Sequence, residues 1–165
     1  MTAKIIKRFN LRINSSTKNI KMEIVCSTDS KYIMPTGIML LSLFESNRGE
    51  VVNVHLLHDH DSAALLDPIR AIAASYQQNI HFYLINDDIF EHFPIGLDFQ
   101  LDHVGTSFAT YYRLYLTEIL PADIDKVIYL DGDILVVDKL VKLWNTSVEN
   151  YAIAAVPDSY NNNIE

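Results

Sequence analysis

The chain has 165 residues, 49% of them hydrophobic and 21% charged, which is enough apolar material for the core of one domain and excludes a wholly disordered chain. No apolar run reaches the roughly 18 residues of a membrane span, and the single cysteine, Cys26, excludes an internal disulfide and a cysteine-based zinc site. Residues 1–22 contain six basic and no acidic residues, so the remainder carries 7 basic and 21 acidic groups. A body this acidic is poorly suited to nucleic acid and would need a cation to bind a phosphorylated ligand.

The basic N-terminal segment is predicted to be separate from the folded domain. Residues 1–21 are rich in Lys, Arg, Asn and Ser and lack an apolar stretch of signal-peptide length. We therefore expect a flexible leader that contributes little to folding, followed by one domain over residues 22–165. The alternative is a basic arm that contacts an anionic membrane surface.

From Met22 onward, strand and helix patterns alternate. Apolar, β-branched runs predict strands over 22–28, 51–58 and 80–85, and helical patterns lie over 33–46 and from Asp61 or Ser62 to Tyr76. Alternation of this kind indicates βαβ units and a mainly parallel sheet. In such a sheet the ligand-binding crevice lies beyond the carboxyl ends of the strands.

Two prolines and one helix face give more local expectations. Pro35 suits the first turn of the helix over 33–46, whose buried side is expected to include Ile38, Leu41 and Phe44. Pro68 should kink the second helix or mark its true start.

The second half of the chain is less regular at first. After a stretch around Pro94, Gly96 and Gly105, Thr106-Ser107 can cap a helix over 108–119. Further strands are predicted over 126–130, 134–137 and 151–156.

The sequence Asp131-Gly132-Asp133 places two carboxylates one glycine apart between apolar runs. Because burying two unpaired charges is costly, the motif forms either a solvent-facing turn or a cation site. Oxygen ligands suit Mn²⁺ or Mg²⁺, which could bridge a diphosphate, and glycine lets a phosphate approach the backbone. The alternative is a type I′ hairpin turn at Asp-Gly. The pattern does not choose between them.

Two further features have both a structural and a functional interpretation. His55, His58 and His60 could suggest zinc, but a polar strand end that runs into a helix cap explains the cluster better. Arg113 lies in a helix of Tyr, Leu, Phe and Thr, where its guanidinium either pairs with an acidic residue or faces phosphate or sugar oxygens in the cleft.

Three segments together resemble the retaining glycosyltransferases of family 8, which include lipopolysaccharide galactosyl- and glucosyltransferases and glycogenin. Ile24–Tyr32 (IVCSTDSKY) is similar to the family's first strand and nucleotide-binding turn. Thr110–Leu114 (TYYRL) resembles the helix whose arginine reaches the donor, and Tyr129–Asp133 (YLDGD) resembles the metal-binding Asp-x-Asp. The similarity extends from Met22 to the last residue, and the segments occur in the family's order.

The resemblance implies an α/β fold of the GT-A type, with a Rossmann-like, mainly parallel sheet flanked by helices. It also implies transfer of glucose or galactose from a UDP-sugar to a glycan or lipid-linked saccharide, with retention. Asp131 and Asp133 would hold Mn²⁺ or Mg²⁺, Asp29 would contact the uridine, and Tyr32 would stack on the uracil. The donor-binding residues by this resemblance are Ser27, Thr28, Asp29, Tyr32, Arg113, Leu130, Asp131 and Gly132. Arg113 and Asp158 would act near the departing diphosphate and the transferred sugar. We expect a cytoplasmic protein with at most peripheral contact with the inner membrane face.

The chain also departs from the family pattern. Lys31 stands where members often have Asn, and no histidine follows Asp133 to complete the metal shell. We therefore expect the N-terminal portion of a catalytic domain. One rival is a haloacid-dehalogenase-like phosphatase with Asp131 as nucleophile and Asp133 as acid, although that pattern normally follows the first strand. A second rival is a non-catalytic fragment that binds nucleotide.

Overall fold

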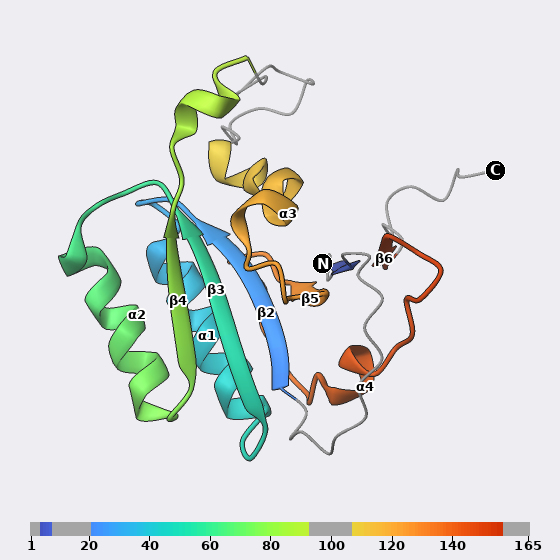
Figure 1. Cartoon of the computed structure of the whole chain (residues 1–165). Coiled ribbons are helices and arrows are strands. Elements are labelled where there is room, and N and C mark those ends of the chain that lie inside the picture. The colour runs from blue at the N-terminus through green and yellow to red at the C-terminus, as the bar shows by residue number, and fades with distance from the viewer. Residues whose placement is uncertain (1–3, 8–20, 93–106, 157–165) are drawn as a thin grey trace, which may run out of the picture.

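The computed structural model describes residues 4–7, 21–92 and 107–156. Its six-stranded sheet has the order β4-β3-β2-β5-β1-β6 (Figure 1). The strands are β1 (Lys4–Lys7), β2 (Lys21–Thr28), β3 (Val51–His58), β4 (Asn79–Leu84), β5 (Lys126–Tyr129) and β6 (Ile153–Ala155). The α-helices are α1 (Ile33–Ser46), α2 (Ala63–Ser75), α3 (Leu116–Ile119) and α4 (Val141–Trp144). Three short 3₁₀ helices are η1 (Asp87–Phe90), η2 (Phe108–Thr110) and η3 (Tyr112–Tyr115).

The predicted mainly parallel sheet is confirmed. Strand β2 pairs in parallel with both β3 and β5, and β3 pairs in parallel with β4. Helices α1 and α2 connect β2 to β3 and β3 to β4, as in βαβ units. Helix α2 continues through Pro68 from its N-cap, Ser62. The carboxyl ends of β2 and β5 consequently meet at one edge of the sheet.

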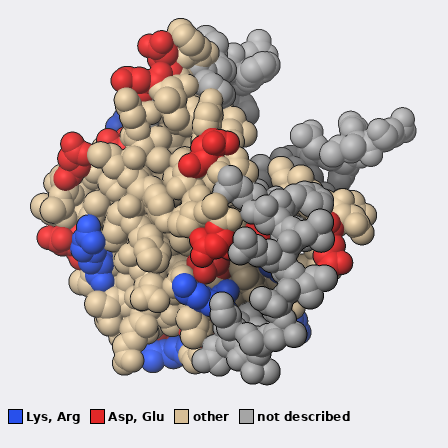
Figure 2. All heavy atoms as spheres, in the orientation of Figure 1, with Lys and Arg blue, Asp and Glu red and all other residues tan. Residues whose placement is uncertain are grey.

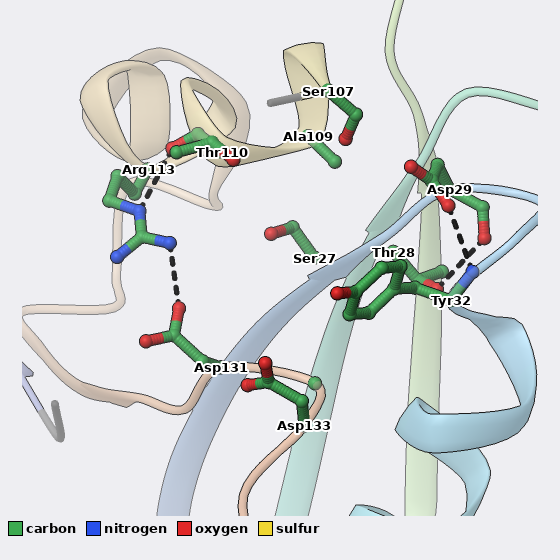
Figure 3. Close-up of a pocket in the computed structure, with 11 residues that line it drawn as sticks. Ser27, Thr28, Asp29, Tyr32, Ser107, Ala109, Thr110, Arg113, Asp131 and Asp133 are labelled. Atoms are coloured by element: carbon green, nitrogen blue, oxygen red, sulfur yellow. Dashed lines mark hydrogen bonds and ion pairs between the residues drawn. The ribbon is translucent and has the colours of Figure 1, made fainter. Parts of the chain in front are cut away.

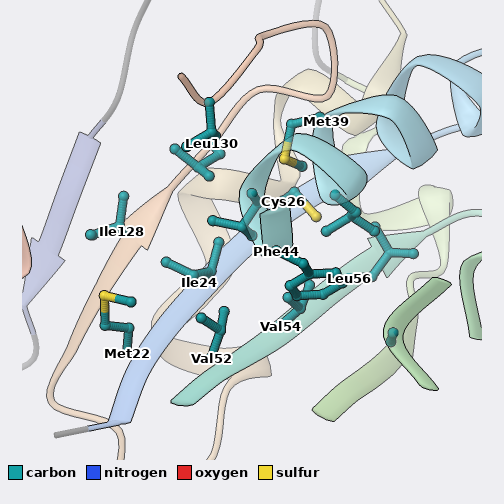
Figure 4. Packing of buried hydrophobic residues seen from close by; sticks show 14 of the residues in the cluster. Met22, Ile24, Cys26, Met39, Phe44, Val52, Val54, Leu56, Ile128 and Leu130 are labelled. Atoms are coloured by element: carbon teal, nitrogen blue, oxygen red, sulfur yellow. The ribbon is translucent and has the colours of Figure 1, made fainter. Parts of the chain in front are cut away.

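One face of the sheet packs against α1 and α2 (Figure 4). Because successive strand residues point to opposite faces, every second residue of β2 and β3 enters this core: Met22, Ile24, Cys26, Val52, Val54 and Leu56. Burial raises the pKa of the Cys26 thiol to about 12, as expected of an inert core cysteine.

The expected buried face of α1 is only partly right. Phe44 is buried, but Ile38 and Leu41 are 54% and 41% exposed. Apolar residues occur on several sides of α1, so periodicity does not identify the packed side. The small residue Gly37 faces α2, where Ile69 lies 3.4 Å from the position that a Cβ atom would take. Gly37 belongs to the buried side of α1, and Ile38 and Leu41 lie outside that side.

A second apolar cluster lies on the face of the sheet opposite to α1 and α2. Val25 and Leu57 of the sheet contribute to it together with Phe90, Tyr112 and Tyr129. The predicted helix over 108–119 is here broken into η2, η3 and α3. Aromatic and β-branched residues weaken helix formation, and the Arg113 Nε–H donates to the Thr110 carbonyl, 2.9 Å away. The backbone hydrogen bond from Leu114 to Tyr111 instead spans three residues.

The strand predicted over 134–137 does not form. The Val136 N–H donates to Ser42 Oγ at 2.9 Å, and Ser46 Oγ donates to the Val136 carbonyl at 2.8 Å. Two serines of α1 therefore satisfy the backbone groups that a neighbouring strand would pair. Without that strand the type I′ hairpin interpretation of Asp131-Gly132 is wrong.

The N-terminal segment differs in part from the predicted flexible leader. Residues Lys4–Lys7 form β1, which lies between β5 and β6 and is antiparallel to both. Strand β1 pairs with β5 through backbone groups, and the basic composition of the segment does not predict such pairing. Residues 1–3 and 8–20 lie outside the described part of the chain.

Acidic side chains are spread over several elements of the face shown in Figure 2 rather than gathered in one patch. The charge felt by a ligand at any one place is therefore set mainly by the nearest side chains. Among the described residues, no helix combines the length and the apolarity that crossing a bilayer requires.

Candidate functional site

A cavity of about 300 Å³ lies beyond the carboxyl ends of β2 and β5 (Figure 3). Three segments that are far apart in the sequence line it: residues 27–32 at the end of β2 and in the turn that follows, 107–113 at η2 and η3, and 131–133 after β5. In Figure 3, Arg113 and Asp131 lie on one side, Asp29 and Tyr32 on the other, and Ser27 between them. The position agrees with the rule that ligands bind at the carboxyl ends of parallel strands.

The turn from β2 into α1 forms one wall. Asp29 Oδ1 accepts hydrogen bonds from the backbone N–H groups of Lys31 and Tyr32, each at 2.9 Å. This Asx-type arrangement fixes the turn just before α1 begins. Tyr32 follows with 43% of its surface exposed. Its ring is therefore accessible to a ligand.

Gly132 also lines the cavity, and its backbone packs closely against α1. A Cβ atom at this position would lie 2.5 Å from Thr36 Oγ1, a fully buried hydroxyl that donates to Thr28 Oγ1 at 3.1 Å. Among the described glycines, only Gly49 has a positive φ. The requirement at Gly132 is therefore steric contact with α1 and not a left-handed backbone.

An ion pair forms the opposite wall. Arg113 Nη2 lies 2.7 Å from Asp131 Oδ1, and both side chains are partly exposed, at 19% and 28%. The guanidinium carbon lies 4.4 Å from the centroid of the Tyr129 ring. The Tyr129 hydroxyl is in turn 2.5 Å from Ser27 Oγ. The sequence left open whether Arg113 pairs with an acid or faces the cleft, and the structure shows that it does both.

Most of the residues predicted from the sequence line this cavity: Ser27, Thr28, Asp29, Tyr32, Arg113, Asp131, Gly132 and Asp133. Leu130 does not line it, because its side chain is buried in the core beneath α1 and its N–H bonds to the Val25 carbonyl. Asp158 lies outside the described residues.

Three further lining residues were not predicted as site residues: Ser107, Ala109 and Thr110. The sequence suggested a helix-capping role for Ser107 and lacks the Gly-x-Ser-x-Gly motif of a nucleophilic serine, and the other two have side chains without distinctive chemistry. Their role follows from the packing of η2 over the sheet, which no local pattern reveals.

The carboxylates of Asp131 and Asp133 fit a hard divalent cation. Both line the cavity, and Mg²⁺-like ions are commonly held by one or two carboxylates together with substrate phosphates and water. Within the described ranges no group of three or more His, Cys, Asp or Glu side chains is arranged to hold a metal. Two carboxylates are fewer ligands than such an ion takes, so a cation held here would need further oxygen ligands.

Two of the three neighbouring histidines belong to β3 and point to opposite faces of the sheet, and His60 follows the end of that strand. His55 contacts Glu23 and the Tyr83 hydroxyl, each at 2.9 Å. His58 lies on the α1 and α2 face, where its Nδ1 is 2.8 Å from the His60 carbonyl. Burial lowers the pKa of His58, which favours the neutral ring. The cluster thus reflects strand alternation.

Comparison with known proteins agrees with the fold. The model of glycosyl transferase family 8 matches residues 23–165. A putative glycosyltransferase of Haemophilus influenzae is 30% identical over 139 residues, which are 84% of this chain and 40% of that protein. The lipopolysaccharide glucosyltransferase WaaO of Escherichia coli is 27% identical over 143 residues, covering 85% of this chain and 39% of WaaO.

Solved structures give the same result. The galactosyltransferase LgtC, in complex with donor and acceptor sugar analogues, superimposes with a TM-score of 0.63 and 33% identity over 76% of this chain and 43% of LgtC. GlyE of Streptococcus pneumoniae, at 20% identity and a TM-score of 0.64, shares the fold over 88% of this chain and 32% of GlyE.

The fold is thus that of the GT-A glycosyltransferases, a mainly parallel sheet with flanking helices. Because the family model covers nearly the whole chain, the chain belongs to glycosyl transferase family 8. The chain spans about two fifths of the length of the relatives named above.

Proposed function

We propose that the chain is the nucleotide-binding part of a retaining hexosyltransferase that uses a UDP-sugar and a divalent cation, Mn²⁺ or Mg²⁺. The donor would be UDP-glucose or UDP-galactose, and the acceptor a hydroxyl group of a glycan or lipid-linked saccharide. Membership of family 8 and the similarity to WaaO and LgtC support a sugar transfer.

The observation that carries the proposal is the convergence of three segments on one cavity. An exposed aromatic ring (Tyr32), a guanidinium (Arg113) and two neighbouring carboxylates (Asp131 and Asp133) line the same space. A uridine diphosphate has a flat base, an anionic diphosphate and phosphate oxygens that can share a cation. The base and the diphosphate of this ligand therefore each have a complementary group in the cavity.

The residues of this chain would act mainly on the leaving group. Tyr32 would stack on the uracil, and Arg113 would donate hydrogen bonds to a phosphate oxygen while it keeps its contact with Asp131. Asp131 and Asp133 would hold the cation, which supplies Lewis-acid stabilisation of the diphosphate. The bond between the anomeric carbon and the β-phosphate oxygen breaks in the reaction, so negative charge grows beside Arg113.

The test is a calorimetric titration of UDP with and without Mn²⁺. We expect the cation to strengthen UDP binding to the wild type, and Asp133→Asn to abolish most of that gain without loss of stability. Asp67→Asn is the matched control, because Asp67 is an exposed aspartate of α2 away from the cavity. UDP binding that is equally tight without Mn²⁺ would contradict the metal bridge.

Activity assays separate the rival functions. Release of UDP from UDP-glucose or UDP-galactose, without hydrolysis of p-nitrophenyl phosphate, is expected of a glycosyltransferase. The reverse result would support the phosphatase, in which Asp131 is the nucleophile. Binding of UDP without either product would support a nucleotide-binding fragment.

A further inference from the structure

Tyr129 is a buried residue that touches two cavity-lining side chains without lining the cavity itself. Its side chain is 0% exposed, although it directly precedes the Leu130-Asp131 segment. Its hydroxyl lies 2.5 Å from Ser27 Oγ, and the Arg113 guanidinium lies 4.4 Å from its ring centroid. One phenol thus connects the β2 side of the cavity with the η3 side.

Strand geometry explains this position. Tyr129 and Asp131 are two residues apart, and alternate residues of an extended chain point to the same side. Arg113 can therefore contact the ring of Tyr129 and the carboxylate of Asp131 together. Tyr129 is also paired with Val25 in the parallel register, so Ser27 lies on the same face, two residues farther along β2.

The chemistry of a buried phenol suits a supporting role. The Tyr129 hydroxyl is enclosed by the fold and exchanges a hydrogen bond with Ser27, which fixes the plane of the ring. A neutral aromatic face attracts a guanidinium without using any of its N–H donors. Arg113 directs Nε to the Thr110 carbonyl and Nη2 to Asp131. The ring, the carbonyl and the carboxylate together restrict the guanidinium to one orientation at the cavity wall.

We propose that Tyr129 is a positioning residue for the nucleotide: it holds Arg113 and Ser27 in the orientation in which they meet the diphosphate. This rests on the proposed function, because the diphosphate is the group that Arg113 would contact. The proposal assigns Tyr129 an effect on ligand affinity through Arg113, beyond the packing expected of any buried tyrosine.

The first test compares Tyr129→Phe with Tyr129→Leu in UDP titrations with Mn²⁺. Phe keeps the ring and loses only the bond to Ser27, so we expect affinity to fall by about two- to threefold. Leu also loses the aromatic face, and we expect a loss of about fivefold or more. Phe44→Leu is the matched control, because it removes a fully buried ring from the core beneath α1. We expect that control to lower stability and leave UDP affinity unchanged.

The second test repeats Tyr129→Leu in an Arg113→Gln background. If Tyr129 acts through Arg113, the Tyr129→Leu substitution should cause little further loss of UDP affinity in this background, since the group that Tyr129 positions is absent. An equal loss in both backgrounds would overturn the proposal, because it would show a general packing effect. Wild-type affinity in folded Tyr129→Leu would overturn it as well.

A third readout does not depend on UDP. A guanidinium above a ring face has its Nε–H proton shifted upfield, and the Arg113 signal can be assigned by its loss in Arg113→Lys. We expect this signal to move downfield in Tyr129→Leu and to stay near its position in Tyr129→Phe. An unchanged signal in Tyr129→Leu would overturn the positioning role. If the wild type binds no UDP with Mn²⁺, the proposed function fails, and the Arg113 signal alone then decides whether Tyr129 positions this residue.

Discussion

At the scale of single residues, Gly132 shows how a site can depend on the absence of a side chain. The buried Thr36 hydroxyl occupies the space beside its Cα, and Thr36 is also held by its bond to Thr28. A β-branched residue in a helix has few alternative rotamers. The Asp131-Gly132-Asp133 segment can therefore approach α1 this closely only with glycine in the middle.

We expect Gly132→Ala to destabilise the fold by about 1–3 kcal/mol, the usual range for overpacking. Denaturant unfolding measures the loss. Thr36→Ala removes the clashing hydroxyl, so the double variant should be more stable than the sum of the single effects predicts. Gly37→Ala is the control, since its Cβ would meet Ile69 at 3.4 Å, an ordinary contact. Equal losses at both glycines would contradict the steric explanation.

Arg113 is expected to weaken the binding of the cation when no nucleotide is present. Its guanidinium is 2.7 Å from Asp131 Oδ1, on one of the two carboxylates that would hold the cation, and like charges repel at short range. We expect Arg113→Gln to bind Mn²⁺ alone more tightly, by about threefold or more if the repulsion is about 0.7 kcal/mol. The same variant should bind UDP with Mn²⁺ more weakly. Mn²⁺ titration followed by electron paramagnetic resonance measures the first effect, and equal or weaker Mn²⁺ binding would contradict it.

At the scale of elements, the first half of the chain was predictable because local and tertiary preferences agree there. The predicted bounds of α1 and β3 match the structure, since an apolar pattern and flanking polar residues point to the same limits. Residues 134–137 show the opposite case. Their pattern is that of a strand, but Ser42 and Ser46 take the hydrogen bonds of Val136. No pattern within the segment could reveal that contact.

The candidate site also has features that the sequence predicts and features that depend on tertiary packing. The position of Asp131 and Asp133 near Asp29 follows from the rule that parallel strands end at one edge. The contact of Arg113 with the Tyr129 ring, and the lining role of Thr110, depend on how η2 and η3 pack across the other face. That packing rests on long-range contacts of aromatic residues such as Phe90 and Tyr112, which are 5.5 Å apart between ring centroids.

Strand β1 leads to a prediction that replaces the expectation of a dispensable leader. Deletion of residues 1–7 leaves one edge of β5 unpaired and separates β6 from the sheet. We expect a loss of about 1–2 kcal/mol, which lowers Tm by roughly 3–8 °C for a chain of this size. Deletion of residues 1–3, which precede β1, is the control. Calorimetry that shows the same Tm for both deletions would mean that β1 contributes no stability.

For the whole molecule, His58 is expected to contribute to the pH dependence of stability. Burial lowers its pKa in the folded state below the ordinary value of 6.5. Below about pH 6.5 the unfolded chain therefore binds more protons than the folded one, and stability falls as the pH falls. His58→Asn keeps an amide near the Nδ1 position but does not titrate. The difference in unfolding free energy between wild type and His58→Asn should thus shrink between pH 7.5 and pH 5.5, and a constant difference would contradict this assignment.

The acidic charge of the molecule leads to the last prediction, which concerns two ligands together. Residues outside the basic segment carry 21 acidic and 7 basic groups, and UDP adds further negative charge. Without Mn²⁺, the carboxylates of Asp131 and Asp133 repel the phosphates of UDP. Without UDP, the Arg113 guanidinium repels Mn²⁺. Together the ligands neutralise one another, because phosphate and carboxylate oxygens share one ion.

We therefore expect the two ligands to stabilise the fold cooperatively. At 100 times its Kd, a ligand raises the free energy of unfolding by about 2.7 kcal/mol, which corresponds to roughly 5–10 °C in Tm. With both ligands present, each at 100 times the Kd that it has in the presence of the other, Tm should rise by about that amount, whereas each alone at the same concentration should shift it by less than about 2 °C. Asp133→Asn should lose most of the joint shift, and Asp67→Asn should keep it. Shifts that simply add in the wild type would show that Mn²⁺ and UDP bind independently, because only ligands that share contacts can strengthen each other's binding.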